Sequence, residues 1–216
     1  ATVTLNRPES RNAIATQQDC DDLAGALWQA NDDADINVVI LTGAGKSFCA
    51  GGDLKAIRER SGIGPRATPD GTRANYRKGV HSVIKALADI EVATIAAING
   101  HAIGLGLDIG ILCDIRLAGA SAKMASSFVK VGIIPGDGGA WILTNAIGAS
   151  RAAELVLTGD TIDAEEAMRF GLVSRVVPDE ALMDEALKLA ERVAVNPPRS
   201  VRLAKRLLRE AQHGRL

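Results

Sequence analysis

The chain has 216 residues, 47% of them hydrophobic, and a formal net charge of −1 at pH 7. This length predicts one domain with one substantial core. The near-zero charge and an aromatic content of 3% give no basis for binding nucleic acid or a membrane surface. The scattered cysteines Cys20, Cys49 and Cys113 form no zinc or CxxC pattern, and we find no signal peptide or long apolar run. We therefore expect reduced thiols, no metal site and a cytoplasmic location.

The N-terminal part of the chain alternates strand and helix patterns. Thr2–Leu5 is typical of a strand, and Thr16–Ala30 has the apolar spacing of an amphipathic helix. Val38–Thr42 is an apolar strand followed by GAGKS, which imitates a phosphate-binding P-loop. The imitation fails on spacing, because the P-loop pattern needs a glycine at position 40 and Ile40 is there.

A glycine-rich turn, FCAGGDL, comes directly after this strand. Its Gly51 and Gly52 leave backbone N–H groups accessible, and Leu54–Arg60 is predicted to be a short helix. Ser61–Thr72 holds three glycines and two prolines among polar residues. This composition predicts a mobile loop, which is either a lid or a plain surface connection.

A helix is predicted from the 3.6-residue spacing of Tyr76, Val80, Ile84 and Leu87. His81 lies next to these apolar positions, and we interpret it as a packing or surface residue rather than a catalytic one.

The stretch Ile95–Asp114, IAAINGHAIGLGLDIGILCD, predicts a buried strand, a glycine turn and an apolar helix that begins near Leu105. The first N–H groups of such a helix have no partner inside it, and the helix dipole adds positive potential there. This end could bind an anion or an oxygen that becomes one during a reaction. Asp108 lies in the first turn of the helix, where its carboxylate could reach the same space, and we predict that it is the principal acid–base residue. His101, within the glycine turn, is a weaker catalytic candidate.

Two other interpretations of this glycine turn stay open from the residues alone. Its GxxxGxG spacing is similar to a dinucleotide-binding turn, although the chain has no Tyr-x-x-x-Lys motif to accompany it. Alternatively, the glycines only allow close packing of helix on strand, and Asp108 only complements the helix dipole.

The remainder of the chain continues the α/β alternation. The sequence PGDGG, which contains Asp137, is a third glycine turn that opens a helix. Asp163 is predicted to cap another helix, with Glu166 completing a capping box. The other expected elements are strands at Ile115–Ala118, Lys123–Ala125 and Leu172–Val177, a helix at Arg151–Leu157, and a last helix beginning at Asn196-Pro197.

FCAGGDL followed by NGHAIGLGLDIGILCDIRLA resembles the enoyl-CoA hydratase/isomerase (crotonase) superfamily, and the resemblance runs from LNRPESRNAI to LTGDTIDAEEAMRFGLVSRVVP. It implies an α/β, crotonase-like ββα spiral with C-terminal helices. Residues 1–178 would form the spiral core, and 179–216 a C-terminal helical region, within one structural domain. Family members extend further at both ends, so both termini are expected to be incomplete. A homotrimer or dimer of trimers is the implied assembly.

The resemblance also implies an acyl-CoA substrate, with coenzyme A as part of the substrate and no separate cofactor. The backbone N–H groups of Gly52 and Leu105 would bind the thioester oxygen. The substrate would be lined by the residues around these two turns, namely Cys49, Ala50, Gly51, Asp53, Leu54, Gly104 and Phe128, and Lys55 with nearby basic residues would meet the nucleotide phosphates.

The chain departs from the family pattern at the acid–base positions. Asp108 stands where hydratases carry their first glutamate, and Phe128 stands at the second. Asp137 is the other candidate carboxylate, either catalytic or a helix cap, and some isomerases carry an aspartate one residue earlier in this turn. The best interpretation is an enoyl-CoA hydratase. The alternatives are a double-bond isomerase that uses one carboxylate and a catalytically weak acyl-CoA-binding or assembly protein.

Overall fold

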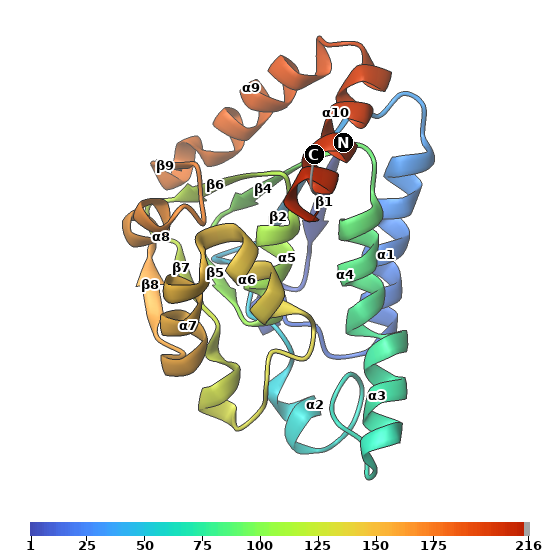
Figure 1. Ribbon diagram of the computed structural model, residues 1–216, viewed down its shortest axis with the longest axis vertical. Helices are drawn as coiled ribbons and strands as arrows, with labels where there is room; N and C mark the ends of the chain where they lie inside the picture. The colour runs from blue at the N-terminus through green and yellow to red at the C-terminus, as the bar shows by residue number, and fades with distance from the viewer. Residues whose placement is uncertain (214–216) are drawn as a thin grey trace.

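The computed structural model describes residues 1–213 and shows two sheets surrounded by helices (Figure 1). The larger sheet is entirely parallel, with strand order β1-β2-β4-β6-β9. Its strands are β1 (Thr2–Leu5), β2 (Val38–Gly43), β4 (Ala93–Ile98), β6 (Ile115–Gly119) and β9 (Arg175–Val177). The smaller sheet has the order β3-β5-β7-β8, with β8 antiparallel to β7. Its strands are β3 (Ser47–Cys49), β5 (His101–Ile103), β7 (Lys123–Ala125) and β8 (Thr161–Asp163).

Helices cover both faces of the larger sheet. The main helices are α1 (Gln17–Asp32), α2 (Leu54–Arg58), α3 (Pro69–Lys78), α4 (Val80–Asp89), α5 (Leu105–Leu112), α6 (Gly139–Ile147), α7 (Ala149–Thr158), α8 (Ala164–Phe170), α9 (Leu182–Ala194) and α10 (Pro198–His213). In the described part of the chain, 3₁₀ turns accompany them at η1 (Pro8–Ser10), η2 (Ser127–Val131) and η3 (Asp179–Ala181). Within residues 1–213, no helix is long and apolar enough to cross a membrane.

The central strands are continuous apolar runs because both of their faces are buried. In β2, Val39 and Leu41 join the cluster that contains α1, α4 and α5, whereas Val38 and Ile40 pack under α9 on the opposite face. Figure 1 shows α1 and α4 side by side along one flank, α9 and α10 at the upper end, and α2 and α3 at the lower end.

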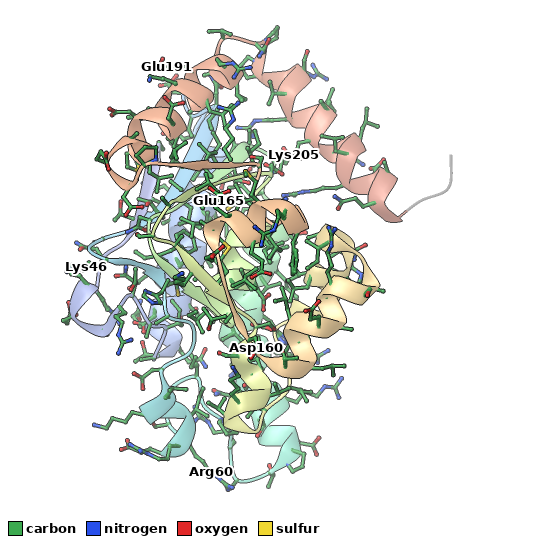
Figure 2. All side chains as sticks on the ribbon, turned by 90° about the vertical axis from the view of Figure 1, so that its left-hand side faces the viewer. Lys46, Arg60, Asp160, Glu165, Glu191 and Lys205 are labelled. Atoms are coloured by element: carbon green, nitrogen blue, oxygen red, sulfur yellow. The ribbon has the colours of Figure 1, made fainter. Side chains whose placement is uncertain are left out.

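A buried lysine fixes the last helix to the larger sheet. Lys205 of α10 is 6% exposed, and its Nζ lies 2.7 Å from Asp114 Oδ2 and donates to the Val92 carbonyl at 2.7 Å. Figure 2 shows Lys205 on the side of α10 that faces the interior. The same Asp114 oxygen accepts hydrogen bonds from the backbone N–H and hydroxyl of Thr94. Asp114 therefore connects β4, the end of α5 and α10.

Several predicted boundaries were wrong between the first and second glycine turns. Ser61–Thr72 is not all loop, since α3 begins at Pro69 and the Thr68 hydroxyl caps it by accepting from the Gly71 N–H. The helix predicted from Tyr76 to Leu87 is broken at Gly79 into α3 and α4. The short helix after the first turn ends at Arg58, because Arg60 has a φ of 53°.

Other differences are small and have local causes. Thr16 is the N-cap of α1, outside the helix, and it forms a capping box with Asp19. The predicted strand Leu172–Val177 shortens to β9, and Asp163 caps α8 as expected, by accepting from the Glu166 N–H. The last helix begins at Pro198, one residue later than predicted, because the Asn196 side chain bonds back to carbonyls of α9.

Candidate active site

A cavity of about 170 Å³ lies where the two predicted glycine turns come together. Seven residues predicted from the sequence to form the site line it: Ala50, Gly52, Leu54, Gly104, Leu105, Phe128 and Asp137. The remaining lining residues come from α2, α3, α4, β5, η2 and the adjoining loops. Most of them are apolar or aromatic, namely Ile57, Ile63, Tyr76, Val80, Ile103, Val131 and Ile133, and the polar members are Ser127 and Lys130. The cavity is thus largely apolar, with one carboxylate in its wall.

The two glycine turns touch backbone to backbone. A Cβ placed on Gly51 would lie 2.3 Å from the Ile103 carbonyl oxygen, and one on Gly106 would lie 2.2 Å from that of Cys49. Real Cβ atoms do not approach backbone oxygens this closely, so only glycine fits at either position. This contact brings the first turn against the N-terminus of α5.

Backbone pairing directs the Gly52 N–H away from its neighbouring strand. Gly52 pairs with Ile14 in a parallel bridge, in which the Ile14 N–H donates to Gly51 O and the Asp53 N–H donates to Ile14 O, both at 2.8 Å. In such a bridge, the central residue's own N–H points to the opposite side. Because Gly52 lines the cavity, this donor is available to an oxygen there.

Leu105 supplies a second backbone donor from the start of α5. The first hydrogen bond of the helix joins the Asp108 N–H to Gly104 O at 3.1 Å, so the Leu105 N–H precedes the intrahelical ladder. Gly104 reaches this geometry at φ 53° and ψ −121°, which favours glycine. The ring of Phe128 covers it, with Cζ 3.4 Å from the position of a Cβ on Gly104. Gly52, Leu105 and Phe128 therefore share one cavity wall.

Three other predicted lining residues belong to the first glycine turn but lie outside the cavity wall. Cys49 is fully buried, its thiol donates to Asn12 O at 3.2 Å, and burial raises its pKa to about 12. Gly51 packs against β5, as described above. The Asp53 side chain caps α2 by accepting from the Ala56 N–H at 2.7 Å. These residues shape the turn, and their contact with substrate stays a prediction.

The two candidate carboxylates lie together at the N-terminus of α6. Asp108 is 0% exposed and Asp137 is 5% exposed, and only Asp137 belongs to the cavity wall. A Cβ on Gly139 would lie 2.3 Å from Asp108 Oδ2, so glycine leaves the space that Asp108 occupies. The Gly139 N–H also donates to Asp137 Oδ1 at 3.2 Å. The carboxylate nearest the cavity is therefore Asp137, with Asp108 sealed behind it.

Burial favours the neutral form of this pair. Desolvation raises the pKa of Asp108 well above its usual range, and the charge of Asp137 raises it further. Burial also raises the pKa of Asp137, although hydrogen bonds from Asp108 and the Gly139 N–H oppose the shift. Within residues 1–213, both Oδ atoms of Asp108 and Oδ2 of Asp137 meet no N–H or O–H donor. A proton on Asp108 resolves this, because a carboxylic acid donates to a neighbouring carboxylate. A pair that held one proton would contain one acid and one base.

Two residues that the sequence did not single out for the site lie beside Asp137. Tyr76 lines the cavity, and its pKa is raised by burial and by the charge of Asp137. His81 lies 2.8 Å from the Gly136 carbonyl oxygen through its Nε2 atom. Gly79, which interrupts the helical pattern between them, was the available signal that this segment bends. His101, by contrast, belongs to β5 and is exposed.

The predicted loop is held in place by side-chain hydrogen bonds. The Arg66 guanidinium donates to the carbonyls of Arg60 and Gly62 and to the Asn75 side chain. This arrangement holds the segment that contributes Ile63 to the cavity. A role as a lid stays a prediction.

The family model described as "Enoyl-CoA hydratase/isomerase" matches residues 1–216 of the chain. The chain belongs to the enoyl-CoA hydratase/isomerase family. It is 37% identical to a probable enoyl-CoA hydratase of Mycobacterium bovis over 209 residues, covering 97% of the chain and 77% of that protein. It is 36% identical to the 2,3-dehydroadipyl-CoA hydratase of Escherichia coli over 210 residues, covering 97% and 78%.

Solved structures agree with this assignment. The enoyl-CoA hydratase of Bacillus anthracis matches with a TM-score of 0.87 and 38% identity, covering 96% of the chain and 77% of that structure. A monofunctional enoyl-CoA isomerase of Mycobacterium smegmatis matches with a TM-score of 0.81 and 34% identity, covering 100% and 90%. The predicted α/β crotonase fold is confirmed, and the chain is an enzyme of the enoyl-CoA hydratase/isomerase type. The division at residue 178 stays a prediction.

Proposed function

We propose that this family member adds water across the double bond of a 2-enoyl-CoA thioester, with Asp108 and Asp137 acting as one acid–base pair. The observation that carries the proposal is the pairing of these carboxylates next to the cavity lined by Gly52 and Leu105. Hydration needs a base for the water and an acid for the α-carbon, and a carboxyl pair with one proton supplies both. The names of the hydratase relatives point to the same reaction.

The two backbone donors would act on the thioester. The carbonyl oxygen becomes negatively charged as water adds to C3, and the N–H groups of Gly52 and Leu105 would donate to it. One such donor is typically worth about 3–4 kcal/mol of barrier. Because both donors are backbone groups, leucine at position 105 leaves this function intact.

The proton balance follows from the pair. The ionised carboxylate of Asp137 takes a proton from the water as its oxygen bonds to C3. The pair then holds two protons and delivers one to C2 of the enolate. It returns to its one-proton state, and no cofactor takes part, since coenzyme A remains attached to the product.

Isomerisation of a 3-enoyl-CoA is the second candidate, and Phe128 favours it. By resemblance, this position holds the second glutamate of hydratases, yet here an apolar ring lines the cavity. Moving a proton between C2 and C4 of a bound enolate needs one base and no water. A protein of the same fold from M. smegmatis is named as a monofunctional enoyl-CoA isomerase, which supports this second candidate.

The absorbance of the conjugated thioester separates these reactions. With purified protein and a panel of 2-enoyl, 3-enoyl and ring-bearing CoA esters, hydration removes the absorbance of a 2-enoyl substrate. Isomerisation creates it from a 3-enoyl substrate. No change with any ester would contradict both reactions and leave the acyl-CoA-binding or assembly role, which binding of a saturated acyl-CoA would then test.

The remaining expectations also belong to this proposal. Lys55 lies exposed on α2 beside the cavity residue Leu54, which supports a contact with the CoA phosphates. The exposed leucines of α10 (Leu203, Leu207 and Leu208) support assembly into a homotrimer or a dimer of trimers. The buried free cysteines support a cytoplasmic location. Among residues 1–213, no group of His, Cys, Asp and Glu side chains could hold a metal ion.

A further inference from the structure

The turn that carries Asp137 is contacted by two aromatic side chains from the region where α3 meets α4. His81 Nε2 lies 2.8 Å from the Gly136 carbonyl oxygen. Tyr76 packs on the same glycine, with Cε1 3.4 Å from the position of a Cβ on Gly136. The two rings contact each other edge to face, with centroids 6.0 Å apart and an interplanar angle of 81°. Gly136 is therefore contacted by both rings immediately before the residue that lines the cavity.

The chemistry of the His81 contact fixes the direction of its hydrogen bond. A carbonyl oxygen only accepts, so Nε2 carries the hydrogen and donates it. The Gly136 N–H donates to Ile134 O at 2.7 Å, and the Gly138 N–H reaches Pro135 O at 3.4 Å, so the His81 bond adds a contact on the carbonyl side of Gly136. A peptide unit transmits displacement directly, with neighbouring Cα atoms about 3.8 Å apart. A shift of the Gly136 carbonyl therefore moves Asp137.

The break between α3 and α4 orients His81 toward this turn. A Cβ on Gly79 would lie 2.6 Å from Gln17 Oε1, so the α1 side chain occupies the space that another residue would need. Gln17 in turn donates from Nε2 to the Asn75 side chain at 2.9 Å. Helix α1 therefore helps to hold the break, and His81 follows it by two residues.

We propose that His81 is a positioning residue, which fixes Asp137 by donating its Nε2 hydrogen to the Gly136 carbonyl. This inference rests on the proposed acid–base function of the Asp108–Asp137 pair. His81 does not belong to the described cavity wall, so it acts through the turn rather than on substrate. A neutral N–H donor is sufficient for this role.

Two substitutions separate the donor from the ring. His81→Gln places an amide N–H at nearly the reach of Nε2, whereas His81→Leu keeps bulk and loses the donor. With a 2-enoyl-CoA substrate, we expect His81→Leu to lower kcat by about 10- to 100-fold, because a misplacement near 1 Å has effects of this size. The KM should stay within about threefold, and His81→Gln should retain kcat within about threefold. Unchanged kcat in His81→Leu, or equal losses in both variants, would overturn the proposal.

Hydrogen exchange gives a readout that needs no turnover. Amides of residues 136–142 should exchange faster in His81→Leu than in the wild-type protein and in His81→Gln, while amides of α9 stay unchanged. Equal exchange in all three proteins would overturn the proposal. If the wild-type protein turns over none of the CoA esters, the proposed function fails while this measurement still decides whether His81 holds the turn.

A double-mutant cycle addresses folding defects. If His81 acts through Asp137, then adding His81→Leu to Asp137→Asn should change the residual kcat by less than about threefold. Independent, multiplied losses would show that the histidine acts elsewhere and would overturn the proposal. Thermal unfolding identifies any variant that is not folded. If His81→Leu is not folded, the kcat and the hydrogen exchange of His81→Gln decide, and loss of either would overturn the proposal.

Discussion

Helices α5 and α6 both begin in glycine-rich turns, yet their N-termini have opposite contents. Neither N-cap, Gly104 for α5 or Gly138 for α6, offers a side chain to cap the helix. At α5, the N-cap Gly104 and the first residue Leu105 line a cavity. At α6, the same kind of end is occupied by the protein's own carboxylates, Asp137 and Asp108.

This difference separates two uses of one local structure. The open end of α5 suits an oxygen that arrives with the substrate and gains charge during the reaction. The filled end of α6 stabilises a carboxylate that is already present, and its dipole opposes the rise in pKa that burial causes. Burial still dominates for both aspartates. Burial and the helix end therefore act in opposite directions on the pKa of this pair, and burial has the larger effect.

The largest effect should come from removing the base at the filled end. Asp137→Asn keeps the shape of the side chain and its contact with the Gly139 N–H but cannot accept the proton of water. We expect kcat to fall by about 10²- to 10⁴-fold, measured with the substrate that the wild-type protein turns over.

Asp163→Asn is the matched control for this change. Asp163 also accepts a backbone N–H at a helix start, and asparagine caps helices as well as aspartate does. Its kcat should stay at the wild-type value. Full activity of Asp137→Asn would contradict its role as the base and would assign that role to Asp108.

The second-largest effect should come from removing a backbone donor at the open end of α5. Leu105 is the first residue of α5, where proline is tolerated, so Leu105→Pro removes one backbone donor and leaves the helix start possible. We expect kcat to fall by about 10²- to 10³-fold. Leu105→Met, which keeps the N–H and nearly the same volume, should remain close to wild type. Similar kinetics for the two variants would exclude the Leu105 donor.

A third test changes the contact that brings the first turn to α5. Gly106→Ala forces a methyl group against the Cys49 carbonyl, 2.2 Å from the ideal Cβ position. We expect a loss of about 1–3 kcal/mol in the free energy of unfolding, measured by chemical denaturation, together with weaker turnover.

Gly110→Ala is the control on the same helix. Its Cβ would meet the Ile98 side chain at 3.4 Å and the Phe48 ring at 3.5 Å, both side chains rather than backbone, and alanine favours helix. We expect it to match or exceed the wild-type stability. If both variants lose stability equally, the close approach of the two turns is not the cause.

The smallest effect is a slope in stability with pH. The folded-state pKa of Asp108 is raised above its unfolded value, so above about pH 4 the folded protein retains a proton that the unfolded chain releases. Its contribution to stability is therefore lost as the pH rises toward the folded pKa, by at most about 1.4 kcal/mol per pH unit. Asp108→Asn lacks this slope and should gain stability relative to wild type as the pH rises. Parallel stability curves would show that Asp108 is ionised in the folded protein.

Local patterns predicted the elements that depend on local chemistry. The apolar runs of β2 and β4, the glycine turns and the cap at Asp163 can all be read from neighbouring residues. The stretch before Tyr76 was predicted to be a loop because of its Gly and Pro content. This content was given more weight than the helix-start signal of Thr68 followed by Pro69, where α3 in fact begins. The three-residue strands β3, β5 and β8 are too short to show a period.

Long-range features of the site could not be predicted from the sequence. The contact of His81 with Gly136 joins residues 55 positions apart, and no local pattern relates them. The sequence identified both Asp108 and Asp137, but which of them lines the cavity depends on how α5 and α6 pack. Asp108 was predicted to reach the substrate, and the structure places Asp137 in the cavity wall and Asp108 outside it, fully buried. The catalytic roles of both carboxylates stay predictions.

The buried Lys205 has a consequence for the order of folding. Its bond to the Val92 carbonyl joins residues 113 positions apart, and it needs a sheet that is already assembled. Domains generally fold as units, and α10 is synthesised after every strand of the larger sheet, so the ion pair between Lys205 and Asp114 can form only late in synthesis. Contacts that form after the rate-limiting step change the unfolding rate more than the folding rate. We therefore expect the contacts of α10 to slow the unfolding of the enzyme while leaving its folding rate nearly unchanged.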